Sequence, residues 1–442
     1  MVYSEFKKYA KDLLNIAMPI IMGNLGFILI GLGDVLIAGR HSTDTLAAIS
    51  IAMAISSCIM VCGVSLVSAV SPVISNFRGE QIPAKRYFYP SIKFAMLIAF
   101  IVMLIVLAVV PLIDFLNFEA HLVPMIKEYM IISAFATFGG YLHCAMKEFL
   151  QAFEIVLFPN LLTIFAVFLN IILNIILVFG WGIIPSLGVV GLAIASLITR
   201  YFMGLVLFIY AKKVIEPEDY REKDNYYKQI IKVGLPISFA VLIEFVAFNS
   251  VSVFMGRVAG VYAAAQNLVC TLTTASFMIP FAISNAIAVK VGYSNGAKNF
   301  IDLKRYAFIG LGMSVSFMAV SSVIFLLLPE FLVKIFTTDT LLIQISVPVV
   351  CTLACFQVFD GLQVALSGIF KGIKKTKVVM ASNFIGYWMI AIPLGYTLAF
   401  KYDMKLMGFW IALIVSAITL CTIMLIILSK NLRQMKKTFG TN

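Results

Sequence analysis

Charged residues are scarce in this chain of 442 residues, at 12%, whereas 62% of the residues are hydrophobic. That balance excludes an ordinary soluble globular protein. Histidine is rarer still, with three residues in all, so the histidine and metal clusters of a membrane-embedded enzyme are not available. The seven cysteines lie in apolar runs without the converging ligands that zinc needs. No polar segment is long enough for a nucleotide-binding domain, and glycine-rich phosphate loops and Ser-His-Asp arrangements are missing, which argues against ATP as a driving force.

Long apolar runs fill the chain instead. Each is about 20 residues or longer, the length that spans roughly 30 Å of hydrocarbon. They predict an all-α membrane protein with twelve transmembrane helices, at 13–38, 47–75, 91–113, 123–150, 160–180, 187–211, 234–256, 264–290, 306–329, 341–370, 378–400 and 407–429. The first run is too long for the core of a signal peptide, so we expect it to be part of the helical bundle.

Lysine and arginine are distributed unequally between the connecting segments. With both termini on one side of the membrane, that side holds 24 of them, Lys147 among them. The other side holds six, namely Arg40, Lys127, Arg257, Lys334, Lys401 and Lys405. Because basic residues favour the cytoplasm, the pattern predicts a multi-pass protein of the cell (inner) membrane with both termini cytoplasmic. Topology also accounts for the net charge of +12, so the lipid bilayer is the expected partner and a nucleic acid is not.

An internal repeat divides the chain. After a shift of 217 residues, Pro19 meets Pro236 and Gly79 meets Gly296, and the register holds over about sixty residues. We therefore predict two six-helix lobes related by pseudo-two-fold symmetry, at 1–211 and 234–442, joined by a cytoplasmic linker at 212–233. Two parallel repeats are a known plan of transporters, in which the substrate site lies between the halves.

Two carboxylates in the second half lie deep in apolar runs. Glu244 follows Lys232 by twelve residues, a depth of roughly 18 Å, and Asp360 precedes Lys371 by eleven, roughly 16 Å. Close carboxylates repel when both are ionised, so a proton or a metal cation between them is favoured. Glu244 and Asp360 are therefore candidates for cation coupling and for a Na⁺ site. The alternative is two separate neutral acids that are hydrogen-bonded in the packing.

The first half contains one such carboxylate, Asp34, six residues before Arg40. It is a candidate for binding a cationic substrate or a proton, and the alternative is a salt bridge, either locally to Arg40 or to a neighbouring helix. Asn170 and Asn174 share a helix face because they are four residues apart. They either line a cavity near Asp34 or bond one helix to another.

Two further polar residues lie within apolar runs. Arg200 either pairs with an acid or extends to a boundary of the membrane, and we assign it no transport role. His143 can titrate near neutral pH, but a lone histidine in a helix is more often a packing group. We expect it to be one here.

Several segments together resemble one family. They are "MPIIMGNLGFILIGLGDVLIAGR" around Asp34, "VGLPISFAVLIEFVAF" around Glu244, "AAAQN" at 263–267, "FDGLQVALSGIFKGIKKTK" around Asp360, "YWMIAIPLGYTLAF", and "LNIILNIILVFG" with "LGVVGLAIAS". In order and spacing the chain resembles the multidrug and toxic compound extrusion (MATE) family, in its NorM-like branch, over nearly its whole length.

The resemblance implies a twelve-helix, two-lobed antiporter of multidrug efflux that exchanges Na⁺ or H⁺ for organic, often cationic, substrates, with no other cofactor. We expect it to act as a monomer. In the NorM-like branch the cation site matches Glu244 and Asp360. Other branches use the position of Asp34 with an acid in the fifth helix, where this chain has Asn174. Phe356 stands where some NorM-like members have a cation-contacting tyrosine, which removes a hydroxyl.

Two other readings of the sequence differ from a cation-coupled exporter. One is an exporter or flippase of a lipid-linked or other specific metabolite in the same wider superfamily, which favours a cavity rich in arginine and lysine. The other is a membrane-embedded enzyme. Efflux of a cationic dye from vesicles under a Na⁺ or a pH gradient separates all three.

The charge asymmetry makes a testable prediction of topology. With the 212–233 linker in the cytoplasm, a cysteine introduced by Tyr220→Cys on a cysteine-free background stays unlabelled when an impermeant thiol reagent is applied outside intact cells. The same reagent labels it after the cells are permeabilised. Labelling in intact cells reverses the assignment.

Overall fold

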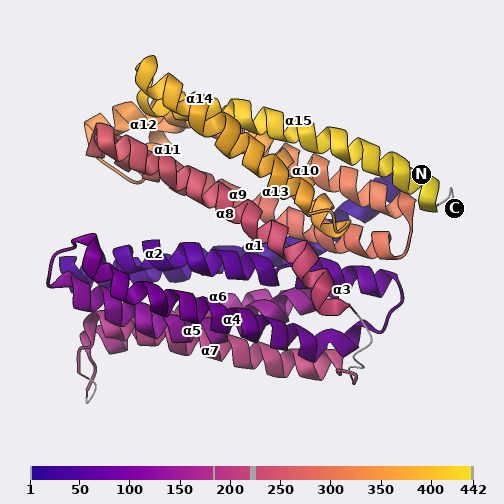
Figure 1. Ribbon diagram of the computed structural model, residues 1–442, viewed down its shortest axis with the longest axis horizontal. Coiled ribbons are helices and arrows are strands. Elements are labelled where there is room, and N and C mark those ends of the chain that lie inside the picture. Colours follow the sequence, from indigo (N-terminus) through magenta and orange to yellow (C-terminus); the bar gives the residue numbers. More distant parts are fainter. Residues whose placement is uncertain (1, 183–184, 220–224, 440–442) are drawn as a thin grey trace. The chain divides into compact units, whose positions relative to one another are not determined.

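The computed structural model describes residues 2–182, 185–219 and 225–439, and over them the chain is helical with no strand (Figure 1). The α-helices are α1 (Val2–His41), α2 (Thr43–Val67), α3 (Val70–Gly79), α4 (Phe88–Val109), α5 (Leu122–Ala152), α6 (Leu157–Phe179), α7 (Gly188–Ile215), α8 (Tyr226–Val258), α9 (Gly260–Gly296), α10 (Phe300–Leu327), α11 (Pro329–Lys334), α12 (Thr340–Gly372), α13 (Lys377–Asn383), α14 (Ile392–Tyr396) and α15 (Lys405–Phe439). The 3₁₀ helices η1 (Ala84–Tyr87) and η2 (Val110–Leu116) flank α4, and the π-helical stretches η3 (Phe384–Ala391) and η4 (Thr397–Lys401) flank α14.

Twelve helical segments of the described chain are long and apolar enough to cross a membrane, as predicted. Several extend beyond the predicted bounds, because a helix continues through polar turns once its backbone bonds are formed. The largest extensions are in α1, which starts at Val2, in α8, which starts at Tyr226, and in α15, which runs to Phe439. The second predicted segment is interrupted after Val67, which separates α2 from α3. Lys147, which was counted among the basic residues of the connecting segments, lies inside α5, as the predicted bounds 123–150 require.

The chain forms two compact units. The N-unit comprises Met18–Ile74 and Gln81–Ser238, and the C-unit comprises Met1–Ala17, Ser75–Glu80 and Phe239–Asn442. These units depart from a division into sequence halves, because two short early segments pack with the later helices. The lobe boundaries at 1–211, 212–233 and 234–442 stay a prediction, and residues 220–224 of that linker lie outside the described residues.

In the N-unit, small residues let α5 and α7 approach closely. A Cβ atom added at Gly139 would lie 2.6 Å from the backbone nitrogen of Tyr201, and one added at Gly204 would lie 2.6 Å from the carbonyl oxygen of Gly139. Helix packing inside a bilayer depends on such backbone proximity, since lipid tails are as apolar as the side chains.

In the C-unit, serines fix α12 to α9 and α10. The hydroxyls of Ser284, Ser314 and Ser322 donate to the carbonyl oxygens of Val364, Gly361 and Ala354 at 2.7, 2.8 and 2.7 Å. These bonds satisfy hydroxyls that would otherwise be unpaired in an apolar environment. They hold α12, the helix of Asp360, in a defined rotation.

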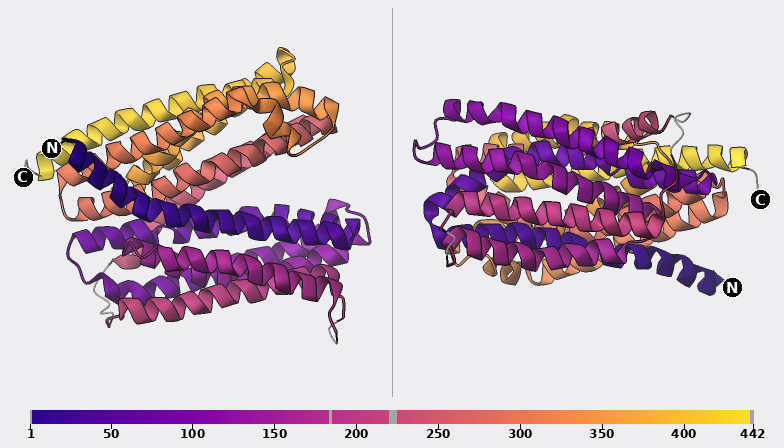
Figure 2. Two further views of the ribbon diagram at one scale, coloured as in Figure 1. Left: turned by 180° about the vertical axis from the view of Figure 1, so that it is seen from behind. Right: turned by 90° about the horizontal axis from the view of Figure 1, so that it is seen from below.

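The first turns of α1 belong to the C-unit through contacts with α10. The Tyr9 hydroxyl donates to Asp302 Oδ1 at 2.6 Å, and Tyr306 donates to Asp12 Oδ2 at 2.8 Å. The beginning of α1 and the end of α15 lie at the same end of the C-unit in all three views (Figures 1 and 2). That placement agrees with an even number of crossings.

A reciprocal contact joins the ends of α3 and α9 within the C-unit. A Cβ atom on Gly79 would lie 2.0 Å from the carbonyl oxygen of Tyr293, and one on Gly296 would lie 2.0 Å from that of Asn76. Residues 76 and 293 are 217 positions apart, as are residues 79 and 296. Gly79 therefore faces Tyr293, whereas Gly296 faces Asn76, the residue that is equivalent to Tyr293 in the repeat. The side chain of Asn295 also donates to Asn76 Oδ1 at 2.7 Å.

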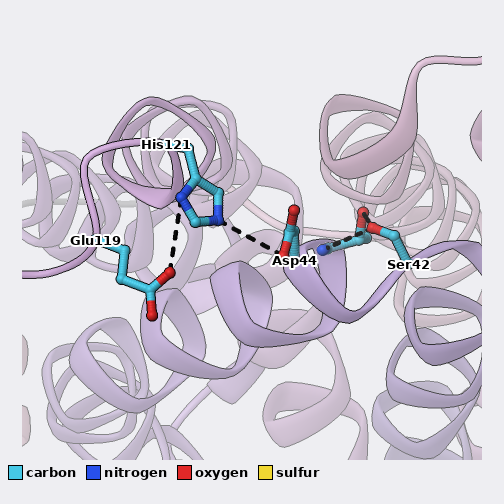
Figure 3. A network of polar contacts seen from close by, with 5 residues as sticks. Ser42, Asp44, Glu119 and His121 are labelled. Atoms are coloured by element: carbon cyan, nitrogen blue, oxygen red, sulfur yellow. Dashed lines mark hydrogen bonds and ion pairs between the residues drawn. The ribbon is translucent and has the colours of Figure 1, made fainter.

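A polar network lies at one end of the N-unit (Figure 3). His121 lies between two carboxylates, with Nε2 3.6 Å from Asp44 Oδ1 and Nδ1 3.6 Å from Glu119 Oε2. Ser42 caps α2, since its hydroxyl accepts from the backbone N–H of Thr45 at 3.0 Å. The network joins the start of α2 to the loop that precedes α5.

The contact between α5 and α7 predicts opposite outcomes for two adjacent glycines. Gly139→Ala forces the helices apart, at a cost of roughly 1–3 kcal/mol, and should lower the apparent Tm in detergent. Gly140→Ala is the matched control, because its Cβ atom would lie 3.6 Å from Arg200 Cδ and alanine favours the helix. Thermal denaturation followed by size-exclusion chromatography measures both, and equal Tm values would contradict the packing argument.

Candidate functional site

The first group of buried polar residues lies in the N-unit around Asp34 on α1. The Asp34 side chain is 3% exposed. Asn174 Nδ2 on α6 donates to its Oδ1 at 2.6 Å, and Ser196 Oγ on α7 donates to its Oδ2 at 3.2 Å. Three helices therefore meet at this carboxylate, which removes much of the cost of taking it out of water.

The two asparagines predicted on one face of α6 belong to this group. Asn174 Nδ2 also donates to Asn170 Oδ1 at 3.1 Å, and both side chains are fully buried. Asn170 Nδ2 and Asn174 Oδ1 have no hydrogen-bond partner. The group thus keeps one free donor and one free acceptor beside a carboxylate.

Arg200 on α7 lies within electrostatic range of Asp34 and makes a 3.9 Å contact from Nη1 to Met60 Sδ. By contrast, no salt bridge joins Asp34 to Arg40 in the described part of the chain. The partners of Asp34 therefore come from other helices and not from the next turns of its own. The positive charge of this arginine weakens the binding of a further cation at the Asp34 carboxylate.

The second group lies in the C-unit around Glu244 on α8 and Asp360 on α12. The two carboxylates are close enough to interact electrostatically with each other and with Tyr387, whose hydroxyl accepts from Gln363 Nε2 at 3.2 Å. Asn383 Nδ2 donates to Glu244 Oε2 at 3.4 Å and to the Ala240 carbonyl oxygen at 3.3 Å. Glu244 is half-buried, whereas Asp360 is 2% exposed.

Several acceptors of this group are left without a donor. They are Asp360 Oδ2, Gln357 Oε1 and Asn383 Oδ1, all on buried side chains. Gln357 is one turn before Asp360, so the two side chains share a face of α12. Carboxylate and amide oxygens are the ligands of hard cations, and a carboxylate pair also takes up a proton.

An aromatic cluster adjoins the carboxylates. Phe248 on α8 and Phe356 on α12 pack against Trp410 on α15, with ring centroids 6.2 and 5.7 Å away, and Phe248 lies 5.9 Å from Tyr387. Phe356 therefore packs in this cluster, where a tyrosine would add a hydroxyl. Such a ring wall lowers the local dielectric and strengthens electrostatic interactions beside it.

The π-helical stretch η3 contains Tyr387 and follows directly after Asn383. A π-turn adds a residue to the helical repeat and rotates the side chains that follow it, and such turns are frequent at functional sites. Pro393 near the start of α14 removes another backbone donor from this helix. The irregular backbone sets the direction of the groups that reach Glu244.

Sequence analysis missed Ser196, Gln357, Asn383 and Tyr387. For Gln357 a signal was available, since it is an amide one turn from Asp360 in an otherwise apolar run. Asn383 is likewise an amide within an otherwise apolar run. Ser196 and Tyr387 had none, because serine and tyrosine are common in apolar helices.

Comparison with known proteins identifies the family. The model of the MatE family matches residues 19–176 and 236–397, and the two matches begin 217 residues apart, the offset of the internal repeat. The probable multidrug resistance protein NorM of Bacillus cereus is 26% identical over 436 residues, covering 96% of this chain and 95% of that protein. Its namesake in Mesorhizobium japonicum is 27% identical over 423 residues, covering 90% and 89%.

Solved structures agree in fold. A mutant of the Vibrio cholerae MATE transporter VcmN superposes with a TM-score of 0.90 at 18% identity, covering 98% of each chain. The eukaryotic MATE transporter AtDTX14 gives 0.86 at 19% identity, covering 98% of this chain and 100% of that one. The predicted fold class, twelve membrane helices in two lobes, is confirmed. With family matches in both halves and twelve membrane-length helices, this multi-pass membrane protein is a transporter and not an enzyme, and it belongs to the MATE family.

Proposed function

We propose that the protein is a cation-coupled antiporter that exports organic, cationic compounds across the cell membrane by alternating access. The observation that carries the proposal is the separation of its buried carboxylates into two groups. Glu244 and Asp360 lie in the C-unit, whereas Asp34 lies in the N-unit with amide neighbours. Where the two exchanged ligands bind separate groups, the affinity of each group depends on the same conformational change, which couples their transport.

The Glu244–Asp360 group takes the coupling ion, Na⁺ or H⁺. Mutual repulsion of two carboxylates in a dry site is relieved by one added positive charge. The unpaired oxygens of Asp360, Gln357 and Asn383 provide the further ligands that a metal cation requires, and the same oxygens accept hydrogen bonds when a proton is bound instead.

The Asp34 group takes the positive charge of the substrate or a proton. Its carboxylate has two donors already, from Asn174 and Ser196, and Arg200 lies nearby. This arrangement suits a diffuse organic cation or a proton better than a bare metal ion, which needs several strong oxygen ligands. The names of the Bacillus and Mesorhizobium relatives, multidrug resistance proteins, support organic substrates.

The surroundings of the transporter complete the proposal. The distribution of lysine and arginine supports a position in the inner membrane with both termini in the cytoplasm. We take the monomer as the transporting unit, since one chain contains both groups of carboxylates.

Neutral variants of the C-unit carboxylates test the coupling role. Glu244→Gln and Asp360→Asn should each reduce gradient-driven dye efflux from proteoliposomes to below about a tenth, since a bond to a charged group contributes about 1.5–3 kcal/mol. Asp339→Asn is the matched control on α12, because that carboxylate caps the helix start, bonded to the backbone N–H of Leu341 at 2.9 Å. Wild-type efflux by either neutral variant rejects the coupling role.

The two groups also predict a separation of binding defects. Asp34→Asn should weaken binding of a cationic dye and leave Na⁺ binding largely intact, whereas Asp360→Asn should do the reverse. Isothermal titration of the purified variants in detergent with dye and with NaCl measures both affinities. Loss of Na⁺ binding in Asp34→Asn, with dye affinity unchanged, would exchange the two roles.

A further inference from the structure

A lysine that forms no salt bridge with any described residue lies inside the N-unit. Lys147 is on α5, five residues before the helix ends at Ala152, and is about 7–8 Å from that end along the axis. Its side chain is half-buried. Within the described residues Lys147 Nζ makes neither a hydrogen bond nor a salt bridge. A cation in such a position is costly unless it has a function or reaches water.

The contact that Lys147 does make is with an aromatic ring on α1. Lys147 Nζ lies 5.5 Å from the centroid of the Phe27 ring, a cation–π contact. The same ring lies 5.7 Å from the His143 ring, edge to face. His143 precedes Lys147 by four residues, so both side chains project from one face of α5 toward Phe27.

Two side-chain nitrogen atoms, one on α5 and one on α1, have no hydrogen-bond partner among the described residues. His143 is 2% exposed, and its Nε2 atom has no hydrogen-bond partner. His143 was expected to be a satisfied packing group, and at Nε2 it is not. Asn24 Nδ2 is also buried without a partner, and Asn24 lies one turn before Phe27 on α1. The Asn24 amide nitrogen is a donor, and His143 Nε2 is a donor when it carries the imidazole proton.

The nearest acidic residue in the sequence, Glu148, lies within electrostatic range of Lys147, but its hydrogen bond is with another residue. Adjacent residues of a helix do not face each other. Glu148 Oε2 is 3.5 Å from the side-chain nitrogen of Gln151, which also donates to Ser71 Oγ at 3.2 Å. Lys147, His143 and Asn24 therefore keep their capacity for an anionic group from outside the chain.

We propose that Lys147, His143 and Asn24 form a subsite for the carboxylate of an organic substrate, with Phe27 against its apolar or aromatic body. The proposal rests on the transport of organic compounds proposed above. A carboxylate accepts several donors at once, and its bond to a lysine is charge-assisted. Phe27 holds the ammonium group in place when no substrate is bound.

Asp34 defines which substrates can use this subsite fully. It follows Phe27 by seven residues on α1, two turns or about 10 Å away on the same face. A compound with an amine and a carboxylate at that separation can place each charge beside a group of opposite sign. The N-unit then selects amphoteric molecules, and a purely cationic molecule uses the Asp34 group alone.

Two dyes that differ in one group test the subsite. Rhodamine 110 has a free carboxylate, and rhodamine 123 is its methyl ester. Fluorescence polarisation gives their Kd values for the purified full-length protein in detergent. Lys147→Gln should weaken binding of rhodamine 110 about tenfold or more, as expected for loss of a bond to a charged group, and leave that of rhodamine 123 unchanged or stronger.

Further variants distinguish loss of the Lys147 charge from misfolding of the protein. Lys147→Arg should retain the binding of rhodamine 110, and His143→Phe should weaken it while the ring contact with Phe27 is kept. Lys212→Gln, at an exposed position on α7, removes one charge from the same unit and should change neither affinity. Unchanged binding of rhodamine 123 shows that each variant is folded.

The outcomes separate this inference from the proposed function. Equal changes for the two dyes in Lys147→Gln, or unchanged binding of rhodamine 110, overturn the subsite. A wild-type protein that binds rhodamine 123 but not rhodamine 110 also overturns it and leaves the proposed function standing. Binding of neither dye contradicts the proposed function, and the subsite with it.

Discussion

A carboxylate inside an apolar helix must find its partners on other helices, and this requirement shapes both units. The turns of the same helix present mainly apolar side chains, and their backbone groups are already bonded to each other. Asp34 meets the requirement with donors from α6 and α7, so three helices are held at one level. The small residues between α5 and α7 and the serines along α12 bring the helices near enough for such contacts.

The hydrogen bonding of the buried carboxylates differs between the two units, and this difference is relevant to the proposed exchange. Around Asp34 each carboxylate oxygen accepts a hydrogen bond, while the amides of Asn170 and Asn174 keep one unpaired nitrogen and one unpaired oxygen. Around Asp360 one carboxylate oxygen and two amide oxygens are without donors among the described residues. If the proposed coupling ion binds there, its binding energy is available to bias one conformation over another.

Sequence alone predicted the number of helices, the repeat and the residues around which each group forms. Asn170 and Asn174 could be placed on one face because helical spacing is regular. Ser196 and Tyr387 could not be found, because their roles depend on how α7 packs and on the π-turn in η3, and neither leaves a mark in composition. Lys147 was counted with the connecting segments because charge marks segment ends on average, although the predicted helix at 123–150 contains it, and its contact inside α5 is with a phenylalanine.

The reciprocal contact of Gly79 and Gly296 has a consequence for the symmetry of the molecule. Two identical six-helix chains related by a two-fold axis would form an isologous contact, in which each copy presents the same patch to the other. Gly79 against Tyr293 and Gly296 against Asn76 have that form, although both now belong to one chain. The contact thus has the geometry of a homodimer contact within one chain, although an asparagine faces one glycine and a tyrosine faces the other.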